Sequence, residues 1–497
     1  MLDYKVWLVI LLAVVVRVWG ISHLPLGMYV DEAALGYNAY SLLLTGRDEY
    51  AQAWPIFLRS FGTYTSALAV YFLTVPIAVG GLSVAAIRLT AVIWGTLTVV
   101  ALYILARKLF RSQTVAIMSA LVLALSPTHV LFSRAFYEPT LALLLFVLAI
   151  AAKLSHRPII SALLLSLSAY AYHPLRLVVI PVLFWQFDWS ATIIFGLTQL
   201  PLWYLSFLPG PNVRFTQLAW LSIIPAKDWL KEYLSQYISY FNPRNLFWLG
   251  DPDPQRSVPN LSMFYFWQVI PWGLGLAYIV RQFKKLTFLW LLLLISPMAA
   301  AITRDPFSTS RAIILLVPTA LVIGLGLRQM GWWKWAGVFI SVVLLWRGLA
   351  IYLPQTRYKE WNYGYRELFS YIANQESLAL AVVDQPVYVL YLFYQKIDPR
   401  YVQSLGRNQI QNYYTDTKWV NYYHDLNVRF DPLIWEKDVY ISQLIAGNGL
   451  LISPNQAQEH LFTKEFTFSY QNQILTAAYL THPDQKLKSL NSKTQNQ

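Results

Sequence analysis

The chain has 497 residues, of which 57% are hydrophobic and only 13% are charged, and its mean hydropathy is +0.43. A soluble protein cannot bury so much apolar surface, whereas a lipid bilayer accommodates it, so the composition predicts an integral, multi-pass membrane protein. The net charge of +13 would indicate nucleic-acid binding in a soluble chain, but many Lys and Arg residues occupy short gaps between apolar segments, where they set membrane topology. We therefore expect the bilayer, and no nucleic acid, as a partner. The absence of cysteine excludes disulfides, cysteine nucleophiles and cysteine metal ligands.

Long apolar segments recur along the first 353 residues. The first, Val6–Trp19, is expected to be a retained helix because no small-residue cleavage signal precedes Asp31. With ten further candidates, the sequence predicts about eleven transmembrane helices. These candidates are Val84–Ala106, Thr114–Val130, Pro139–Ala152, Ile159–Tyr172, Leu175–Phe187, Ala191–Leu208, Met263–Val280, Leu286–Ile302, Ala312–Leu327 and Trp335–Leu353.

The basic residues between these segments predict their orientation. If Thr63–Gly80 stays on the outer surface and Ile159–Phe187 forms two short helices, the Lys- and Arg-rich loops all face the cytoplasm. The same topology places five polar clusters on the opposite, extracytoplasmic side. They are Asp31-Glu32, Arg134–Glu138, His173–Arg176, Asn242–Asn260 and Thr303–Arg311. Every group that could carry out chemistry is therefore expected on one surface.

The pair Asp31-Glu32 follows the first span directly. Apolar residues at helical spacing after it, from Ala33 to Leu44, predict an outer juxtamembrane helix that lies along the interface. Two interpretations stay open for the acids. They either begin this helix, where its dipole favours negative charge, or belong to a site.

Two later regions are expected outside the membrane. The connection Pro209–Ser262 is too long and too aromatic for a plain turn, and it predicts a second surface helix at Trp229–Phe241 followed by a lid. Residues 354–497 predict a small extracytoplasmic α/β or α+β domain, separate from the all-α membrane domain over residues 1–353. Its expected elements are strands at Leu378–Val383 and Leu450–Ser453, helices at Glu367–Gln375 and Val387–Tyr394, a hairpin of Phe466–Tyr470 with Gln473–Tyr479, and a solvated tail from about Asp484.

An ordered set of motifs over roughly residues 1–350 resembles the polyprenyl-phosphate-sugar-dependent glycosyltransferases of GT-C fold, a group that includes protein O-mannosyltransferases and aminoarabinose transferases. The motifs are Asp31-Glu32, Gly46-Arg47-Asp48-Glu49, the segment Gly62–Pro76, the run from Ile87 to Gly95, Ser133–Glu138, Asn242–Phe247, Arg304-Asp305-Pro306 and Arg311.

The resemblance implies a membrane enzyme, in a bacterial plasma membrane, that takes a sugar from a polyprenyl-phosphate carrier and transfers it outside the cytoplasm. It implies that Asp31 is the catalytic base and that Glu138 is the second catalytic acid. Two departures from the family pattern matter. The Lys-Pro-Pro segment of some relatives is replaced by Phe61–Ser66, and Phe307 stands where a histidine is expected after Pro306.

Sugar transfer from phosphate to a hydroxyl needs a base, a cation for the leaving phosphate and little competing water. We expect Asp31 to take the acceptor proton and the configuration to invert, without a general acid, because phosphate leaves readily. Arg304 and Arg311 are the preferred phosphate ligands, and Arg176 is another candidate. A single arginine at a membrane edge is also a common snorkelling anchor.

The remaining candidates each have a structural alternative. Glu32 is expected to help at the substrate or to cap its helix. Arg134 is expected near the substrate with Glu138, or in a local ion pair with it. His173 is a ligand or a hydrogen-bonded turn residue, and Tyr64 and Tyr172 stack on sugars or belong to the interfacial aromatic belt. Asp31, Glu32 and Glu138 are candidate ligands for a divalent cation, although no spacing requires one.

Two other functions remain open from the sequence. One is a transporter or flippase of lipid-linked sugars, although the spans are nearly free of ionisable residues and show no repeat. The other is a non-catalytic glycan-assembly protein. The acceptor, whether a protein, a lipid or a glycan, is not indicated. Trp361, Tyr363 and Tyr365 are candidate acceptor contacts or core residues of the outer domain.

Overall fold

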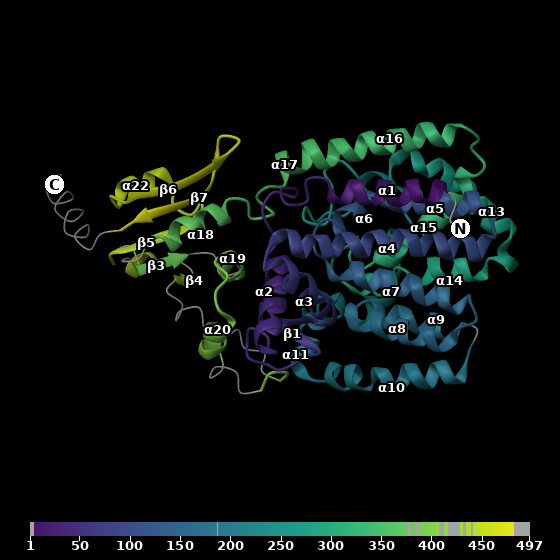
Figure 1. Cartoon of the computed structure of the whole chain (residues 1–497), viewed down its shortest axis with the longest axis horizontal. Coiled ribbons are helices and arrows are strands. Elements are labelled where there is room, and N and C mark those ends of the chain that lie inside the picture. The colour runs from purple at the N-terminus through teal and green to yellow at the C-terminus, as the bar shows by residue number, and fades with distance from the viewer. Residues whose placement is uncertain are drawn as a thin grey trace. The chain divides into compact units, whose positions relative to one another are not determined.

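A computed structural model describes residues 4–185, 187–375, 379–382, 387–406, 412–415, 428–430, 434–438 and 441–481 (Figure 1). The chain divides into two compact units. The first comprises Met1–Pro25, Pro55–Arg357 and Tyr413–Thr417, and the second comprises Leu26–Trp54, Tyr358–Asn412 and Lys418–Gln497. The expected division at residues 353 and 354 lies close to the main boundary. The segment Leu26–Trp54, however, groups with the C-terminal residues.

The first unit is helical. Its α-helices are α1 (Tyr4–Val18), α3 (Leu68–Gly80), α4 (Val84–Phe110), α5 (Gln113–Leu125), α6 (Pro127–Phe132), α7 (Glu138–Lys153), α8 (Pro158–Ala171), α9 (Leu175–Phe184), α10 (Trp189–Ser206), α11 (Pro209–Leu218), α12 (Trp229–Ser239), α13 (Val269–Arg281), α14 (Thr287–Ile295), α15 (Leu316–Leu327), α16 (Trp333–Arg347) and α17 (Leu353–Thr356). A short antiparallel hairpin, β1 (Phe57–Ser60) and β2 (Thr63–Ser66), precedes α3. The surface helix expected at Trp229–Phe241 is present as α12.

Few of these helices are long enough to cross a bilayer on their own. Among the described residues, Val84–Phe110 and Trp333–Thr356 meet the length and hydropathy requirements, and Trp189–Ser206 with Pro209–Leu218 would add a third span bent by 79°. The other apolar segments form shorter helices because prolines and polar residues interrupt them. The predicted Thr114–Val130 helix, for example, breaks at Ser126-Pro127 into α5 and α6. The number of spans therefore stays a prediction.

Small residues bring the central helices of this unit into close contact. All the residues of α15 are buried, and a Cβ placed on Gly326 would lie 1.7 Å from the carbonyl oxygen of Pro271 in α13. A Cβ on Gly275 would likewise lie 2.0 Å from the carbonyl oxygen of Val322. Close backbone contact of this kind is how helices pack when lipid removes the hydrophobic drive to associate.

A fully buried arginine joins three of the helices. Arg17, the one charge in the first apolar segment, donates to the carbonyl oxygens of Ala13 and Ala124 at 3.0 Å and to Ser133 Oγ at 2.8 Å. Its Nη2 also lies 2.8 Å from Nδ1 of His129. These contacts satisfy carbonyl groups at the break between α5 and α6, which explains how a charge is tolerated in an apolar helix.

The second unit combines helices with a mixed sheet. Its elements are α2 (Val30–Thr45), α18 (Tyr365–Ala373), β3 (Ala379–Val382), α19 (Tyr388–Tyr394), α20 (Pro399–Gly406), β4 (Val428–Phe430), α21 (Trp435–Asp438), β5 (Gln443–Asn448), α22 (Pro454–Glu459), β6 (Thr463–Tyr470) and β7 (Gln473–Leu480). The strand order is β4-β3-β5-β7-β6, in which β3 runs parallel to β4 and β5 while β7 is antiparallel to its neighbours.

The local predictions for this unit have mixed outcomes. The hairpin is confirmed as β6 and β7, with Gln471 and Asn472 both at positive φ in the turn, and the two predicted helices are confirmed as α18 and α19. The strand predicted at Leu450–Ser453 is wrong. The strand lies earlier, as β5, and ends where Gly449 closes against the backbone of Ile474, which leaves Leu450 85% exposed. The ends of the predicted Leu378–Val383 strand and the tail from Asp484 lie outside the described residues.

Candidate functional site

The predicted base lies in the second unit. Asp31 and Glu32 occupy the first turn of α2, where the helix dipole favours negative charge. Asp31 is half-buried and Glu32 is 0% exposed. No side-chain hydrogen bond caps this helix at its N-cap residue, Tyr29. The structure therefore confirms the predicted helix and its acidic first turn.

The second predicted acid lies in the first unit, at the first residue of α7. Glu138 Oε1 accepts a hydrogen bond of 2.8 Å from Thr65 Oγ1 on β2. Tyr172, at the C-terminal end of α8, lies within electrostatic range of this carboxylate. Glu138, Tyr172 and the β1–β2 hairpin are thus brought together from three separate parts of the sequence.

Arg134 does not act on Glu138 directly. Its fully buried guanidinium donates to the carbonyl oxygens of Val16 at 2.7 Å, Arg17 at 3.2 Å and Leu24 at 3.1 Å. Val16 and Arg17 lie in the last turn of α1, where carbonyl groups lack helical partners, and Leu24 follows that helix. The geometry accounts for Arg134 as a structural residue without a substrate.

The surroundings of the two arginines that flank Asp305 in the sequence, Arg304 and Arg311, are different. Arg311 Nη1 forms an ion pair of 2.8 Å with Asp305 and donates to Thr303 Oγ1 at 2.9 Å. The exposed Arg304 donates to the carbonyl oxygen of Ala219 at 3.3 Å and to Ser222 Oγ at 3.4 Å. Arg311 also lies within electrostatic range of Tyr172, whose hydroxyl hydrogen-bonds Ser310.

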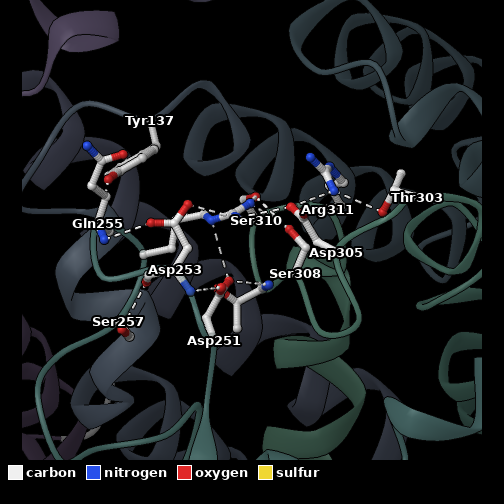
Figure 2. A network of polar contacts seen from close by, with 12 residues as sticks. Tyr137, Asp251, Asp253, Gln255, Ser257, Thr303, Asp305, Ser308, Ser310 and Arg311 are labelled. Atoms are coloured by element: carbon white, nitrogen blue, oxygen red, sulfur yellow. Dashed lines mark hydrogen bonds and ion pairs between the residues drawn. The ribbon is translucent and has the colours of Figure 1, made fainter. Parts of the chain in front are cut away.

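A third arginine, Arg256, contacts several residues of the polar network that Figure 2 shows, among them Asp251, Asp253 and Asp305. Its guanidinium contacts carboxylate oxygens of Asp253 at 2.8 Å, Asp305 at 3.1 Å and Asp251 at 3.6 Å. It also donates to Ser308 Oγ at 2.8 Å and to Ser310 Oγ at 3.2 Å. These contacts fix the loop around residues 251–257 to the loop 303–311.

The electrostatics of the network follow from this arrangement. Burial raises the pKa of Asp251, an effect that Arg256 and hydrogen bonds from Thr309 only partly offset. Burial alone would also raise the pKa of Asp305, but Arg311 and Arg256 outweigh it and lower that pKa. Despite its desolvation, Arg256 has a raised pKa because three carboxylates surround it. The cations and acids of this network therefore neutralise one another.

A second group of cations has no such compensation. The Arg176 guanidinium lies 4.7 Å from the centre of the Phe57 ring and donates through Nη1 to Ser206 Oγ at 3.2 Å. Its Nε and Nη2 are buried and have no hydrogen-bond partner among the described residues. The His173 ring stacks on the same Phe57 ring, with ring centres 5.5 Å apart. Its Nδ1 lies 3.3 Å from Ser66 Oγ, and its buried Nε2 has no hydrogen-bond partner among the described residues.

The charge around these groups is positive. Burial, then Arg176 and then Arg214, lowers the pKa of His173 well below its ordinary value, so the ring is neutral at physiological pH. Arg214, on α11, also lies within electrostatic range of Tyr172. Buried N–H groups without acceptors are rare in folded proteins, and an anion would satisfy them. We define the guanidinium groups of Arg176 and Arg214, together with the neutral imidazole of His173, as the unpaired cationic cluster.

Tyr64 is occupied by contacts within the first unit. Its hydroxyl donates to the carbonyl oxygen of Tyr413, and its ring packs on the rings of Tyr413 and Tyr414. The Tyr413 hydroxyl in turn accepts from the Arg59 amide at 2.8 Å and lies 3.2 Å from the carbonyl oxygen of Phe57. Tyr64 therefore braces this hairpin against residues 413–414.

Sequence reasoning missed Arg214, Arg256 and the pair Tyr413-Tyr414. Arg256 stands three residues after Asp253, and that spacing was a usable signal for an internal ion pair. Arg214 follows the helix-breaking run Pro209-Gly210-Pro211, which marked a new element. For the tyrosine pair the sequence carries no comparable signal.

The structure contains no ready-made metal centre in the part of the chain that it describes. No three His, Asp or Glu side chains there gather closely enough to hold an ion. The cation proposed for Asp31, Glu32 and Glu138 stays a prediction.

Comparisons with known proteins place this geometry in context. Residues 65–195 match the family model for Dolichyl-phosphate-mannose-protein mannosyltransferase. Among solved structures, ArnT from Cupriavidus metallidurans is similar in its apo state, with a TM-score of 0.53 and 12% identity over 96% of this chain and 97% of that chain. The same enzyme bound to undecaprenyl phosphate gives a TM-score of 0.52, also at 12% identity and with the same coverage of both chains.

A more distant likeness is to the oligosaccharyltransferase AglB from Archaeoglobus fulgidus, with a TM-score of 0.46 and 10% identity over 95% of this chain and 74% of that chain. No curated protein matches the chain by sequence. The resemblance drawn from the motifs is confirmed by the mannosyltransferase match and by the ArnT fold.

Proposed function

We propose that this protein is a membrane glycosyltransferase that moves a sugar from a polyprenyl-phosphate carrier to an acceptor hydroxyl outside the cytoplasm, with inversion at the anomeric carbon. The observation that carries the proposal is the unpaired cationic cluster beside Glu138. Buried N–H groups of Arg176 have no acceptor among the described residues, and a phosphate monoester or diester supplies such oxygens. The ArnT structure bound to undecaprenyl phosphate supports a lipid phosphate as the anion.

We propose a different phosphate ligand from the pair of arginines preferred from the sequence. Arg311, preferred from the sequence together with Arg304, already pairs with Asp305, so binding a second anion there would compete with that carboxylate. Arg176 has no acid partner among the described residues, and Arg214 adds charge nearby. We therefore assign the phosphate to Arg176 and Arg214, with Arg311 and Tyr172 at the neighbouring sugar.

The reaction balances without a cofactor. The acceptor oxygen attacks the anomeric carbon while the bond from that carbon to the phosphate oxygen breaks, and the electron pair stays with the phosphate. Asp31 takes the acceptor proton, as the motif resemblance implies. Arg176 and Arg214 stabilise the charge that develops on the departing carrier phosphate, which therefore needs no general acid. Glu138, held by Thr65, orients the acceptor or a bound cation.

Carrier release tests the proposal. Purified protein is incubated with polyprenyl phosphates that carry hexoses or pentoses, and with solubilised envelope material as acceptor, while free carrier phosphate is measured. We expect release by the wild type and at least a hundredfold loss in Asp31→Asn and in Arg176→Gln, with Arg328→Gln, at the exposed end of α15, as the control.

Three other outcomes would contradict the proposal. A flippase would move the donor across vesicles without releasing the free carrier. A non-catalytic assembly protein would bind the donor, with no dependence of any product on Asp31. Release that survives Arg176→Gln unchanged would remove the proposed phosphate ligand.

A further inference from the structure

The segment that carries Asp31 is built into the second unit. Helix α2 packs against α19 and α20, and most of its residues from Glu32 to Leu42 are buried. Helix α2, which the sequence predicted to lie along the membrane interface, is therefore largely covered by protein. Tyr37 and Ser41 on this helix have hydrogen-bond partners more than 300 positions further along the chain. The question is what these partners do for the acid at its first turn.

The N-terminal end of α2 is held by the loop at residues 361–363. Gly27 has φ of +77°, and a Cβ on it would lie 2.1 Å from the carbonyl oxygen of Trp361. Asn362 Nδ2 donates to the carbonyl oxygen of Met28 at 3.0 Å. The rings of Tyr29 and Trp361 meet edge to face with centres 6.3 Å apart. Three consecutive residues before Asp31's turn are thus contacted by one loop.

The C-terminal end of α2 is held independently. Gln403 Nε2 lies 2.9 Å from Ser41 Oγ, 2.8 Å from Thr45 Oγ1 and 3.0 Å from the carbonyl oxygen of Asp48. These three acceptors belong to the last turns of α2 and to the turn that follows it. Gln403 itself lies on α20.

The middle of the helix has a third attachment. The Asn38 side chain both donates to Glu49 Oε1 at 3.1 Å and accepts from the Glu49 amide at 3.0 Å, while the Tyr388 hydroxyl donates to Glu49 Oε2 at 3.3 Å. The Tyr37 hydroxyl donates to the carbonyl oxygen of Ile397 at 2.9 Å. Side chains and carbonyl groups from residues 361–403 therefore fix α2 at its start, middle and end.

We propose that Trp361, Asn362, Tyr388, Ile397 and Gln403 are positioning residues for the catalytic base, with Asn362 and Gln403 the residues that set where the Asp31 carboxylate lies. This inference rests on the proposed function, in which Asp31 takes the acceptor proton. It gives the C-terminal unit a task that requires no acceptor binding. Trp361 is 0% exposed and Tyr365 is 5% exposed, so both are core residues. This is the second of the two interpretations that the sequence left open for them, the first being acceptor contacts.

The first test replaces one hydrogen bond. Asn362 has φ of +52°, and Asn362→Asp keeps the size and the tolerance for this conformation while removing the N–H donor to Met28. Asn472→Asp is the matched control, because Asn472 has φ of +60° and lies exposed in the β6–β7 turn. We expect kcat for carrier release to fall about tenfold to a hundredfold in Asn362→Asp, with the donor KM unchanged, and both to stay unchanged in the control.

A second measurement needs no turnover. Because the chain contains no cysteine, Asp31→Cys introduces a single thiol whose rate of maleimide labelling reports the position and exposure of residue 31. Adding Asn362→Asp, or Gln403→Met as the second variant, should change this rate several-fold, whereas Asn472→Asp should not. Gln403→Met removes the Nε2 donor, while Thr45 Oγ1 and the Asp48 carbonyl oxygen keep the Arg47 and Ala51 amides as partners and Ser41 Oγ still donates to the Arg47 carbonyl oxygen; the side-chain volume is preserved, so a folded protein is expected.

The two measurements separate the hypotheses. Labelling that changes together with kcat supports positioning. Unchanged labelling overturns the inference, whatever happens to activity, and so does altered labelling with normal kcat. If the wild type releases no carrier from any donor while labelling responds to both variants, the proposed function fails and the structural support of residue 31 is still established.

Discussion

Two arginines of the first unit, Arg256 and Arg176, are both largely removed from water, yet their surroundings are opposite. Arg256 contacts three carboxylates and two hydroxyl groups, which compensate its charge, although its Nε has no hydrogen-bond partner among the described residues. Arg176 has one hydroxyl partner and an aromatic ring, and two of its N–H groups have no acceptor among the described residues. A cation whose charge is compensated by carboxylates of the protein stabilises a loop, whereas a buried cation without a carboxylate partner is available to an anionic ligand. This difference separates structure from function in the first unit.

The largest effect is expected at the carboxylate beside the unpaired cationic cluster. Glu138→Gln keeps the side-chain size and still allows a hydrogen bond with Thr65, but it removes the charge. If Glu138 acts on the acceptor or on a bound cation, carrier release should fall by about a hundredfold or more while the amount of folded protein is unchanged. Normal turnover would make Glu138 a helix-capping residue and would weaken the functional side of the comparison.

The next effect separates charge from packing at Arg176. Arg176→Gln should lower carrier release about a hundredfold, and the unfolding temperature should stay the same or rise, because a buried and poorly compensated charge is removed. Arg176→Lys should restore only part of the activity, since an ammonium group cannot present two parallel donors. Initial rates and thermal unfolding in the same detergent provide the measurement. A large loss of stability would show that Arg176 is structural, like Arg256.

The reverse pattern is expected at Arg256. Arg256→Gln leaves Asp251, Asp253 and Asp305 together without their shared cation, and should lower the free energy of unfolding by about 2 to 3 kcal/mol. The matched control is Arg400→Gln, whose partner Asp398 lies at 3.6 Å in a pair with exposed fractions of 69% and 55%. An exposed pair of this kind contributes about 0 to 1 kcal/mol. Equal effects of the two substitutions in denaturant unfolding would refute the assignment of Arg256 as a structural centre.

The smallest effect is the pH dependence of the same network. Arg311 and Arg256 lower the pKa of Asp305, despite its burial, so its ion pairs stabilise the fold above the ordinary carboxyl pKa of about 3.9. This stabilisation is lost as the pH falls through the lowered pKa. Wild type should therefore be more stable than Asp305→Asn at pH 6, and the difference should shrink as the pH falls below about 3.9. A difference that persists in acid would mean that the ionised form of Asp305 is not what stabilises the loop.

Much of the local architecture was predictable. Periodicity and turn residues predicted three elements to within a few positions. They are helix α2 with Asp31 and Glu32 in its first turn, helix α12 and the β6–β7 hairpin. The strand misplaced at Leu450–Ser453 shows where this reasoning stops. A short apolar run looks like a strand, but Gly449, packed on Ile474, ends β5 before that run begins.

The sequence identified most residues of the candidate site, but it did not determine what each of them does there. The sequence marked Glu138, Tyr172, His173, Arg176 and Arg311 from their shared outer topology, and the structure brings these five residues into the first unit. The sequence ranked Arg304 and Arg311 ahead of Arg176 because they share one short loop with Asp305, although each of the three is an arginine at the end of an apolar segment. Their ranking depends on acceptors from other loops, such as Asp305 for Arg311 and Ser206 for Arg176.

Composition and motif order alone determined that the chain is apolar enough for a bilayer, where its acids lie along the chain, and which glycosyltransferases it resembles. Only the tertiary structure decided which charges are paired with carboxylates of the protein, and that the helix of Asp31 is held by Trp361, Asn362, Tyr388, Ile397 and Gln403. The physical reason is range. Helical and strand periodicity arises from neighbouring residues, whereas the partner of a buried charge can come from any distance along the chain, as Asp305 does for Arg256 and Gln403 for Ser41.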